Sequence, residues 1–389
     1  MKKQVWIFLI LTVLLSVTVG CGFVSKRPPV TTVAVSSVAE TTPSATPAPT
    51  PKPTPTPAPT PVPKPTPTPE PDPIFRNIRY DHTLISPREI ELFQDEELFL
   101  AFYRDIIRAV LNYEPVVVIP EEVLEHPGYH VVMNTFQRNN PLEHLSGTPF
   151  QNVEGTEINF FYSYEREEHF RRIEQIESKV EEIISTTIQE DFNLLEATLA
   201  CYRYLASTSV YEESWADSAY GILMNGSGVC RGFTSALRLL LLQAGYDDGY
   251  SIEYSPSDRE QAGHVWNMLL FGENWYHVDA TWENGTSGGM LLDYFGMTDD
   301  ERWSPPGVDT PYLREIDESV PIPRCTDDAF GMLRGAAECI CDLRHHTVYI
   351  RYFDDTWVHW NTQDMSFTPI RELPSSFSDA AQRNTPREG

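Results

Sequence analysis

The chain has 389 residues, a formal net charge of −27 and six cysteines. Almost none of the acidic residues lie in the first 73 positions, so the folded part is strongly acidic, which argues against nucleic acid as a partner. The length allows two average domains, or one large domain with tails.

Residues 1–21 have the pattern of a secretion signal. Two lysines precede an apolar stretch over residues 5–19, which is too short for a membrane span, and small Gly20 follows before Cys21. Gly20-Cys21 also resembles a bacterial lipobox, whose cysteine carries lipid and becomes the new N-terminus. An ordinary signal peptide in which Cys21 is incidental is the alternative. With lipid attached at Cys21, we expect an exported protein anchored on the outer face of the cytoplasmic membrane.

Residues 22–73 are predicted to be a disordered stalk rich in proline and threonine. Between Thr42 and Pro73 nearly every second residue is proline. Such a tract forms polyproline II at about 3.1 Å per residue, so roughly 30 residues reach on the order of 100 Å. The stalk would hold the folded part in or beyond the cell wall. A passive linker is the alternative.

A small α+β region is predicted over residues 74–165, where the composition becomes that of a globular protein. A strand is expected at Val116 to Pro120, and a helix precedes it. Apolar residues at helical spacing define that helix: Phe99, Phe102, Ile106 and Val110.

Three helices are predicted in the first half of the next region, which we bound at residues 166–304. An apolar stripe predicts the first helix over residues 166–189, and Asp191 is suited to cap a second one that ends near Ser207. Cys201 lies on the apolar face of this second helix and is expected to be buried and inert. A loop-rich segment over residues 214–227 leads to the third helix, which starts at Cys230 and ends at a glycine.

Strand-like segments follow the third helix: YSIEY near Ile252, HVWNMLLF from His264 and WYHVDATW from Trp275. Gly272 and Glu273 between the last two segments indicate a hairpin. The order of elements predicts an antiparallel sheet packed on the helix that carries Cys230.

Cys230 stands at a helix N-terminus behind Gly226 and Gly228. Positive potential and unpaired backbone donors at such a position lower a thiol pKa below about 8.5 and make a nucleophile. A buried structural cysteine is the alternative. A nucleophilic thiol needs a base within hydrogen-bond reach, and the base needs an acceptor that orients it.

His264 and Asp279 are placed to supply that base and that acceptor. With a two-residue turn in the hairpin, Trp266 faces Asp279 and His264 faces Thr281, so His264 and Asp279 become diagonal neighbours on one face of the sheet. A register shifted by one residue would put them on opposite faces. A catalytic triad of these residues therefore predicts the unshifted register of the hairpin.

The segments GVCRGF, HVWN and WYHVDATW resemble the three signature blocks of the transglutaminase-like superfamily. The resemblance covers residues 190–300, and YFGMTDDERW at 294–303 resembles the segment that follows the core in bacterial members. It implies a papain-like α+β fold in which Cys230 is the nucleophile, His264 the base and acid, and Asp279 the orienting residue.

The resemblance also suggests Tyr211 as a side-chain donor to the oxyanion hole, with Trp215 as the rival and core packing as the alternative for Tyr211. The backbone N–H of Cys230 is a further donor. Residues next to the triad in sequence are expected to line the cleft, by packing or by stacking on substrate: Trp266, Asn267 and Trp282.

No metal and no cofactor are expected, because no calcium-binding loop is visible. Residues 305–373 predict an accessory α+β unit, with a helix from Asp327 and a strand from Thr347, and residues 374–389 predict a disordered tail. Outside the cell, Cys325 could pair with Cys339 or Cys341 in a disulfide.

The expected activity is acyl transfer on a peptide, protein or cell-wall amide, with water as the acceptor. The same triad also serves protein cross-linking, so a transglutaminase is the first alternative. A surface module that binds peptide or protein without turnover is the second.

Overall fold

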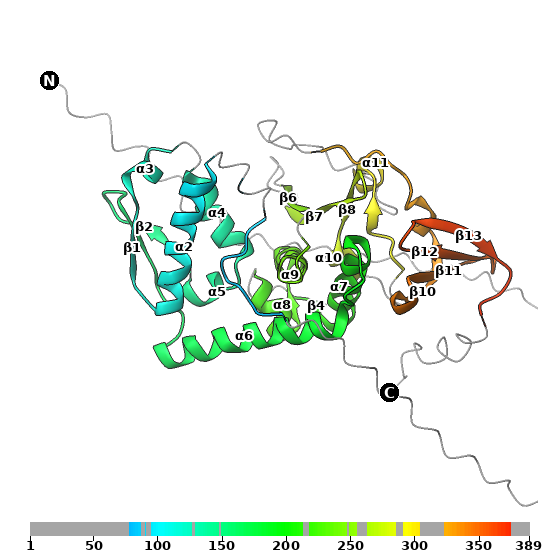
Figure 1. Ribbon diagram of the computed structural model, residues 1–389, viewed down its shortest axis with the longest axis horizontal. Coiled ribbons are helices and arrows are strands. Elements are labelled where there is room, and N and C mark those ends of the chain that lie inside the picture. The colour runs from blue at the N-terminus through cyan, green and yellow to red at the C-terminus, as the bar shows by residue number, and fades with distance from the viewer. Residues whose placement is uncertain are drawn as a thin grey trace, which may run out of the picture. The chain divides into compact units, whose positions relative to one another are not determined.

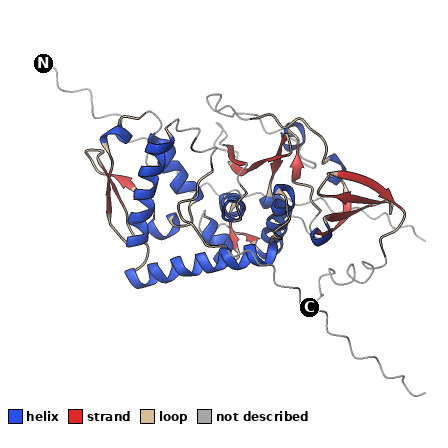
Figure 2. Cartoon of the chain, in the orientation of Figure 1, coloured by secondary structure: helices blue, strands red, loops and turns tan. Residues whose placement is uncertain are grey.

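The computed structural model describes residues 78–86, 90, 95–126, 129–147, 149–212, 218–246, 249–254, 263–284, 291–303 and 323–374. The predicted signal peptide and stalk, Cys21, Trp215 and all but the first residue of the predicted tail lie outside these residues. The fold is α+β, as predicted (Figure 2). Within the described part, no helix is both long and apolar enough to cross a membrane.

Helices and a small sheet form the N-terminal region. The helices are α2 (Glu96–Asn112), α3 (Glu121–Leu124), α4 (Tyr129–Asn139) and α5 (Glu143–Ser146). The sheet has the order β1-β3-β2, with β1 at Val116–Val118, β2 at Phe150–Gln151 and β3 at Glu157–Asn159. Helix α2 confirms the predicted stripe, which is buried. Strand β1 ends before Pro120 because a proline cannot donate to a ladder, and Pro120 instead precedes the first turn of α3.

Helix α6 (Arg166–Thr187) confirms the first helix predicted for the next region. Helix α7 (Leu194–Thr208) follows, but Asp191 is not its cap. Asn193 caps it in a capping box with Glu196: the Asn193 side chain accepts from the Glu196 N–H at 2.9 Å, and the Asn193 N–H donates to the Glu196 carboxylate at 3.1 Å. This reciprocal pair selects Asn193 over the earlier carboxylate.

The segment predicted as loop-rich contains regular structure. Helix α8 (Ala219–Asn225) lies in it, and β5 (Ser227–Gly228) pairs in parallel with β4 (Val210–Tyr211). Gly226 ends α8 with φ = 67°, a left-handed conformation that glycine adopts without strain.

Helix α9 (Cys230–Gln243) begins at the predicted residue (Figure 1). It packs against α7, α8, α10 (Ala280–Asn284) and strand β7 (His264–Phe271). The sheet beside it is antiparallel, in the order β6-β7-β8-β9. Its strands are β6 (Gly249–Tyr254), β7 (His264–Phe271), β8 (Asn274–Val278) and β9 (Phe295–Met297). Phe271 pairs with Asn274, which confirms the two-residue turn.

The segment WYHVDATW is only partly a strand. Strand β8 stops at Val278, and α10 (Ala280–Asn284) begins two residues later. The predicted register of β7 and β8 is confirmed, but the ladder ends at Asn267 and Val278, so the predicted pairing of His264 with Thr281 is not formed. On its other edge, β7 pairs with β6, where His264 faces Tyr254. The chain turns because the Asp279 carboxylate accepts the backbone N–H groups that open α10.

The C-terminal region is an antiparallel sheet in the order β10-β11-β12-β13. Its strands are β10 (Ala336–Asp342), β11 (Thr347–Tyr352), β12 (Trp357–Asn361) and β13 (Ser366–Ile370), with short 3-10 turns at Gly331–Leu333 and Leu343–His345. The strand from Thr347 is confirmed. The helix predicted from Asp327 is wrong, because Gly331 and Gly335 (φ = 74°) interrupt it and the following residues pair with β11.

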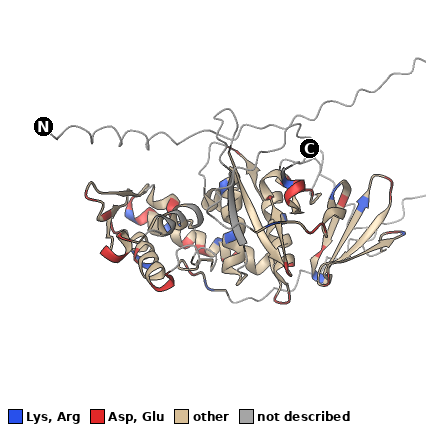
Figure 3. Cartoon of the chain, turned by 90° about the horizontal axis from the view of Figure 1, so that it is seen from above, with Lys and Arg blue, Asp and Glu red and all other residues tan. Residues whose placement is uncertain are grey.

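One apolar cluster runs from α2 through α6, α7 and α9 into the C-terminal sheet. The domain boundaries placed at residues 166 and 305 stay a prediction. Acidic residues occur over much of the described chain rather than in one patch (Figure 3). All five described cysteines are thiols rather than disulfides, so the suggested pairing of Cys325 is not formed. Cys201 is buried as predicted, and burial raises its thiol pKa.

Candidate active site

Cys230 is the first residue of α9 and is buried, with an exposed fraction of 8%. Val229 precedes it in an extended conformation and provides no side-chain cap. The positive end of the α9 dipole therefore acts on the thiol. This is the environment in which a thiolate is stabilised.

Two hydrogen bonds attach the first turn of α9 to the start of β7. The Thr234 hydroxyl donates to the Val265 carbonyl at 3.0 Å, and the Asn267 side chain donates to the Thr234 carbonyl at 3.2 Å. Thr234 lies one helical turn after Cys230, and Val265 follows His264. These bonds therefore hold the thiol end of the helix against the end of the strand that carries His264.

His264 and Asp279 form a buried pair. The His264 Nε2 lies 2.7 Å from the Asp279 Oδ2, and the two side chains are 8% and 0% exposed. Because Nε2 is bound to the carboxylate, Nδ1 is the nitrogen that remains to exchange a proton with a thiol. The structure thus brings together the two residues that the sequence proposed as base and orienting acceptor, although not by the strand pairing predicted for them.

Four donors surround the Asp279 carboxylate. Oδ1 accepts the backbone N–H groups of Thr281 at 3.1 Å and Trp282 at 3.2 Å. Oδ2 faces His264 and also the Arg302 Nη2 at 3.5 Å. Burial acts to raise the Asp279 pKa, but the imidazole, the guanidinium and the Trp282 N–H together lower it below its ordinary value. Asp279 is therefore a carboxylate at neutral pH.

Two indole rings enclose this pair. The His264 ring stacks on Trp266 at a centroid distance of 5.8 Å and on Trp282 at 5.1 Å. Trp266 and Asn267 are each 1% exposed, so they support the site from within rather than line an open cleft. Trp282 is half-buried.

Tyr211 lies in β4 and is half-buried, and its side chain packs against the apolar core. Its backbone N–H donates to the Asn284 side chain at 3.1 Å, and Asn284 also donates to the carbonyls of Ala206 and Ser209. Asn284 thereby fixes β4, a role that its sequence context did not reveal. A part for Tyr211 in an oxyanion hole stays a prediction, and the rival Trp215 is outside the described residues.

Three side chains of the types that bind metal ions lie close together near the site. Ligand atoms of His277, Asp299 and Cys325 all lie within 4.8 Å of one another, and all three residues are buried. Trp266 Nε1 donates to His277 Nδ1 at 2.9 Å. An indole N–H can only donate, so the His277 proton is on Nε2, which faces Asp299 Oδ1 at 3.1 Å.

His277 consequently has no lone pair directed at this cluster. Burial lowers its pKa below the ordinary value, which keeps the ring neutral. Cys325 and Asp299 are already joined by a hydrogen bond between their backbones, in which the Asp299 N–H donates to the Cys325 carbonyl at 2.7 Å. The cluster therefore fits a hydrogen-bonded support for Trp266 better than a metal ligand set.

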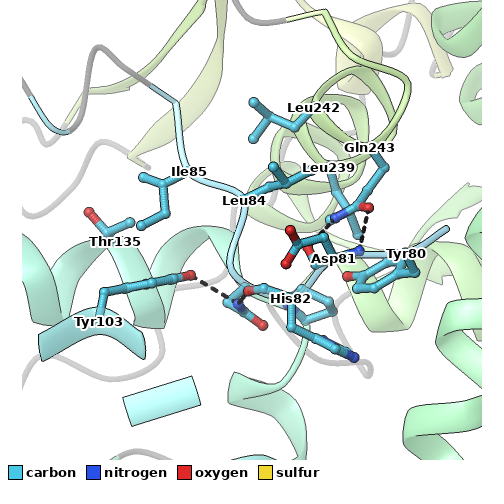
Figure 4. A pocket seen from close by; sticks show the side chains of 12 residues that line it. Tyr80, Asp81, His82, Leu84, Ile85, Tyr103, Thr135, Leu239, Leu242 and Gln243 are labelled. Carbon is cyan, nitrogen blue, oxygen red and sulfur yellow. Dashed lines mark hydrogen bonds between the residues drawn. The ribbon is translucent and has the colours of Figure 1, made fainter. Parts of the chain in front are cut away.

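A small pocket lies far along α9 from the thiol. It is lined by residues 80–82 and by Gln243, the last residue of α9 (Figure 4). Gln243 donates to the Asp81 carbonyl at 2.7 Å and accepts the Asp81 N–H at 3.0 Å. The cavity of about 20 Å³ has room for one water molecule. The two hydrogen bonds between Gln243 and Asp81 attach the first described segment to the end of α9.

A thiol at a helix N-terminus, on an element that is bonded to the strand of a buried histidine–carboxylate pair, is an arrangement suited to an activated nucleophile. Residues 181–280 match the family model of the transglutaminase-like superfamily. This segment is therefore similar to a superfamily that includes both cysteine peptidases and transglutaminases. No curated protein matches the chain.

Two solved structures are similar to parts of the chain. A candidate cysteine protease from Cytophaga hutchinsonii is 19% identical, with 30% of this chain and 39% of that chain covered and a TM-score of 0.24. A TGase is 11% identical, with 40% of this chain and 47% of that chain covered and a TM-score of 0.24. The chain thus spans less than half the length of either protein.

Proposed function

We propose that the protein is a cysteine acyl-transfer enzyme that hydrolyses peptide or cell-wall amide bonds. The observation that carries this proposal is the buried His264–Asp279 pair, with its 2.7 Å contact, at the end of the strand that is bonded to the first turn of the Cys230 helix. A buried ionised carboxylate is costly to keep unless it is fully paired, and here it holds an imidazole in one orientation.

In the proposed reaction, the Cys230 thiolate attacks the amide carbonyl carbon and forms a carbon–sulfur bond. The carbonyl oxygen becomes an oxyanion, which the N–H groups at the start of α9 stabilise. His264 gives its proton to the leaving nitrogen as the carbon–nitrogen bond breaks. Water, deprotonated by His264, then attacks the thioester, so that a carboxylic acid is released and the thiol is restored.

The proposed place of action rests on the sequence. A lipid on Cys21 would anchor the protein to the outer face of the cytoplasmic membrane, and residues 22–73 would carry the folded part toward the cell wall. This location favours hydrolysis of wall peptides, because such amides are then the nearest abundant substrates.

The test uses the mature full-length chain with peptides released from peptidoglycan and with casein, in oxygen-18 water that contains a fluorescent primary amine. We expect heavy oxygen in newly formed carboxylates, none of it with Cys230→Ala, and native activity with Cys339→Ser as the matched thiol control. Incorporation of the amine without new carboxylates would contradict hydrolysis and identify the protein as a cross-linking transferase. If peptide binds to both the native protein and Cys230→Ala and no product forms, the enzyme proposal is wrong and the protein is a binding module.

A further inference from the structure

Arg302 is a buried cation of the candidate site, in the segment YFGMTDDERW, for which no catalytic role was predicted from the sequence. It lies in α11 (Asp299–Trp303) and is 1% exposed. Its guanidinium carbon is 3.9 Å from the centroid of the Trp266 ring and 4.2 Å from that of the Trp282 ring. Both distances are well inside the range of favourable cation–π contact. The two indoles therefore hold this guanidinium between them.

The same two indoles also stack on His264, and Arg302 and His264 share one carboxylate oxygen. His264 Nε2 and Arg302 Nη2 lie 2.7 and 3.5 Å from Asp279 Oδ2, so they are no more than about 6 Å apart. A guanidinium stays charged at every relevant pH. When His264 is protonated, two cations thus face a single carboxylate.

The described ring contacts of His264 are with neutral groups. From β7 and α10 come the neutral indoles of Trp266 and Trp282. On the far side of Trp266, His277 of β8 is neutral because its Nδ1 accepts the indole N–H. Asp279 and Arg302 are the charged partners that the described ion pairs bring to this end of the His264 ring.

We propose that Arg302 is a positioning residue of this enzyme, which fixes the Asp279 carboxylate and makes the His264 imidazolium readier to release its proton. The inference rests on the proposed function. A lone buried carboxylate would hold the imidazolium proton tightly, whereas a permanent neighbouring cation weakens that hold. A general acid of this kind must give its proton to the leaving nitrogen, and it acts best when its pKa lies near the working pH.

The test measures the His264 titration directly, without any substrate. Histidine labelled with carbon-13 at Cε1 is introduced into the mature chain, and the His264 resonance is assigned by its loss in His264→Ala. Arg302→Met removes the charge but keeps an unbranched side chain between the indoles. Arg302→Lys keeps the charge, and Arg324→Met is the matched control, since Arg324 pairs with Asp299 from a side chain that is 60% exposed.

We expect Arg302→Met to raise the midpoint of the His264 titration by about one pH unit, which is a tenfold tighter hold on the proton. Arg302→Lys and Arg324→Met should leave the midpoint within about 0.3 pH units of the native value, a small fraction of that shift. If Arg302→Met does not fold, Arg302→Gln takes its place, because it keeps a donor toward Asp279 without the charge.

An unchanged midpoint in a folded uncharged variant would overturn the proposal, and so would an equal upward shift in the lysine variant. The result is separable from the fate of the proposed function. A shifted midpoint in a protein that turns over no substrate would retain the electrostatic role and reject the enzyme. Turnover with an unshifted midpoint would retain the enzyme and reject the role of Arg302.

Discussion

Replacing Asp279 with asparagine changes one oxygen to an amide nitrogen, and the structure has no good place for that nitrogen. With the amide oxygen toward His264 and Arg302, the NH₂ group meets the backbone N–H groups of Thr281 and Trp282. With the amide oxygen toward those N–H groups, the NH₂ meets the Arg302 guanidinium and forces His264 into its other tautomer. Either orientation sets a buried donor against a donor.

The magnitude follows from the burial of this pair. A buried donor left without an acceptor costs about 1–3 kcal/mol, and breaking a buried ion pair costs about 3–5 kcal/mol. We expect Asp279→Asn to lower the free energy of unfolding by about 3 kcal/mol. For urea, with a denaturant slope near the upper end of about 1–3 kcal/mol/M, the midpoint should fall by about 1 M.

The pH dependence gives an independent check. The Asp279 pKa is lower in the folded protein than its ordinary value, which is about 3.9 in an unfolded chain. Its contribution to stability is therefore complete above about pH 4 and is lost as the pH falls through the folded-state pKa. The difference between the native protein and Asp279→Asn should be full at pH 7 and should shrink in acid.

Urea unfolding of both proteins at several pH values, followed by tryptophan fluorescence, measures these effects. Asp300→Asn is the matched control, because Asp300 is exposed on α11 and its substitution should change stability by no more than about 0.5 kcal/mol. A loss below about 1 kcal/mol for Asp279→Asn, or a difference that does not depend on pH, would refute the argument from the four donors.

Three further changes test other parts of the structure. In His264→Ala, alkylation of Cys230 by iodoacetamide, read by peptide mass spectrometry, should need a higher pH and approach the behaviour of a free thiol near about 8.5, whereas the native protein should react well below pH 7. Gly226→Ala should lower the melting temperature more than Gly245→Ala, because both have positive φ but only at Gly226 does a Cβ come within 3.1 Å of a backbone oxygen. Glu196→Ala removes a fully buried carboxylate that binds His346, just before β11, and Thr362, just after β12. Hydrogen exchange should therefore accelerate over residues 347–361 and stay unchanged in α9.

Local signals in the sequence were sufficient for several elements. The helical stripes of α2, α6 and α9 and the two-residue turn between β7 and β8 were predictable, because spacing and turn chemistry act over a few residues. Local signals failed where two of them competed. Asn193 was overlooked as a cap, and glycines interrupted the helix expected from Asp327.

Cys230, His264 and Asp279 were identified from their chemistry and order along the chain, because a thiol at a helix start, a histidine at a strand start and a nearby carboxylate are each visible locally. The contact between His264 and Asp279 was not decided that way, since the strand that was to carry Asp279 ends at Val278. The role of Arg302, within the segment YFGMTDDERW, and the tautomer of His277 could not be predicted from the sequence. They depend on side chains that meet only when α11, β7, β8 and α10 pack together, so only the tertiary structure could decide which charges share the buried carboxylate.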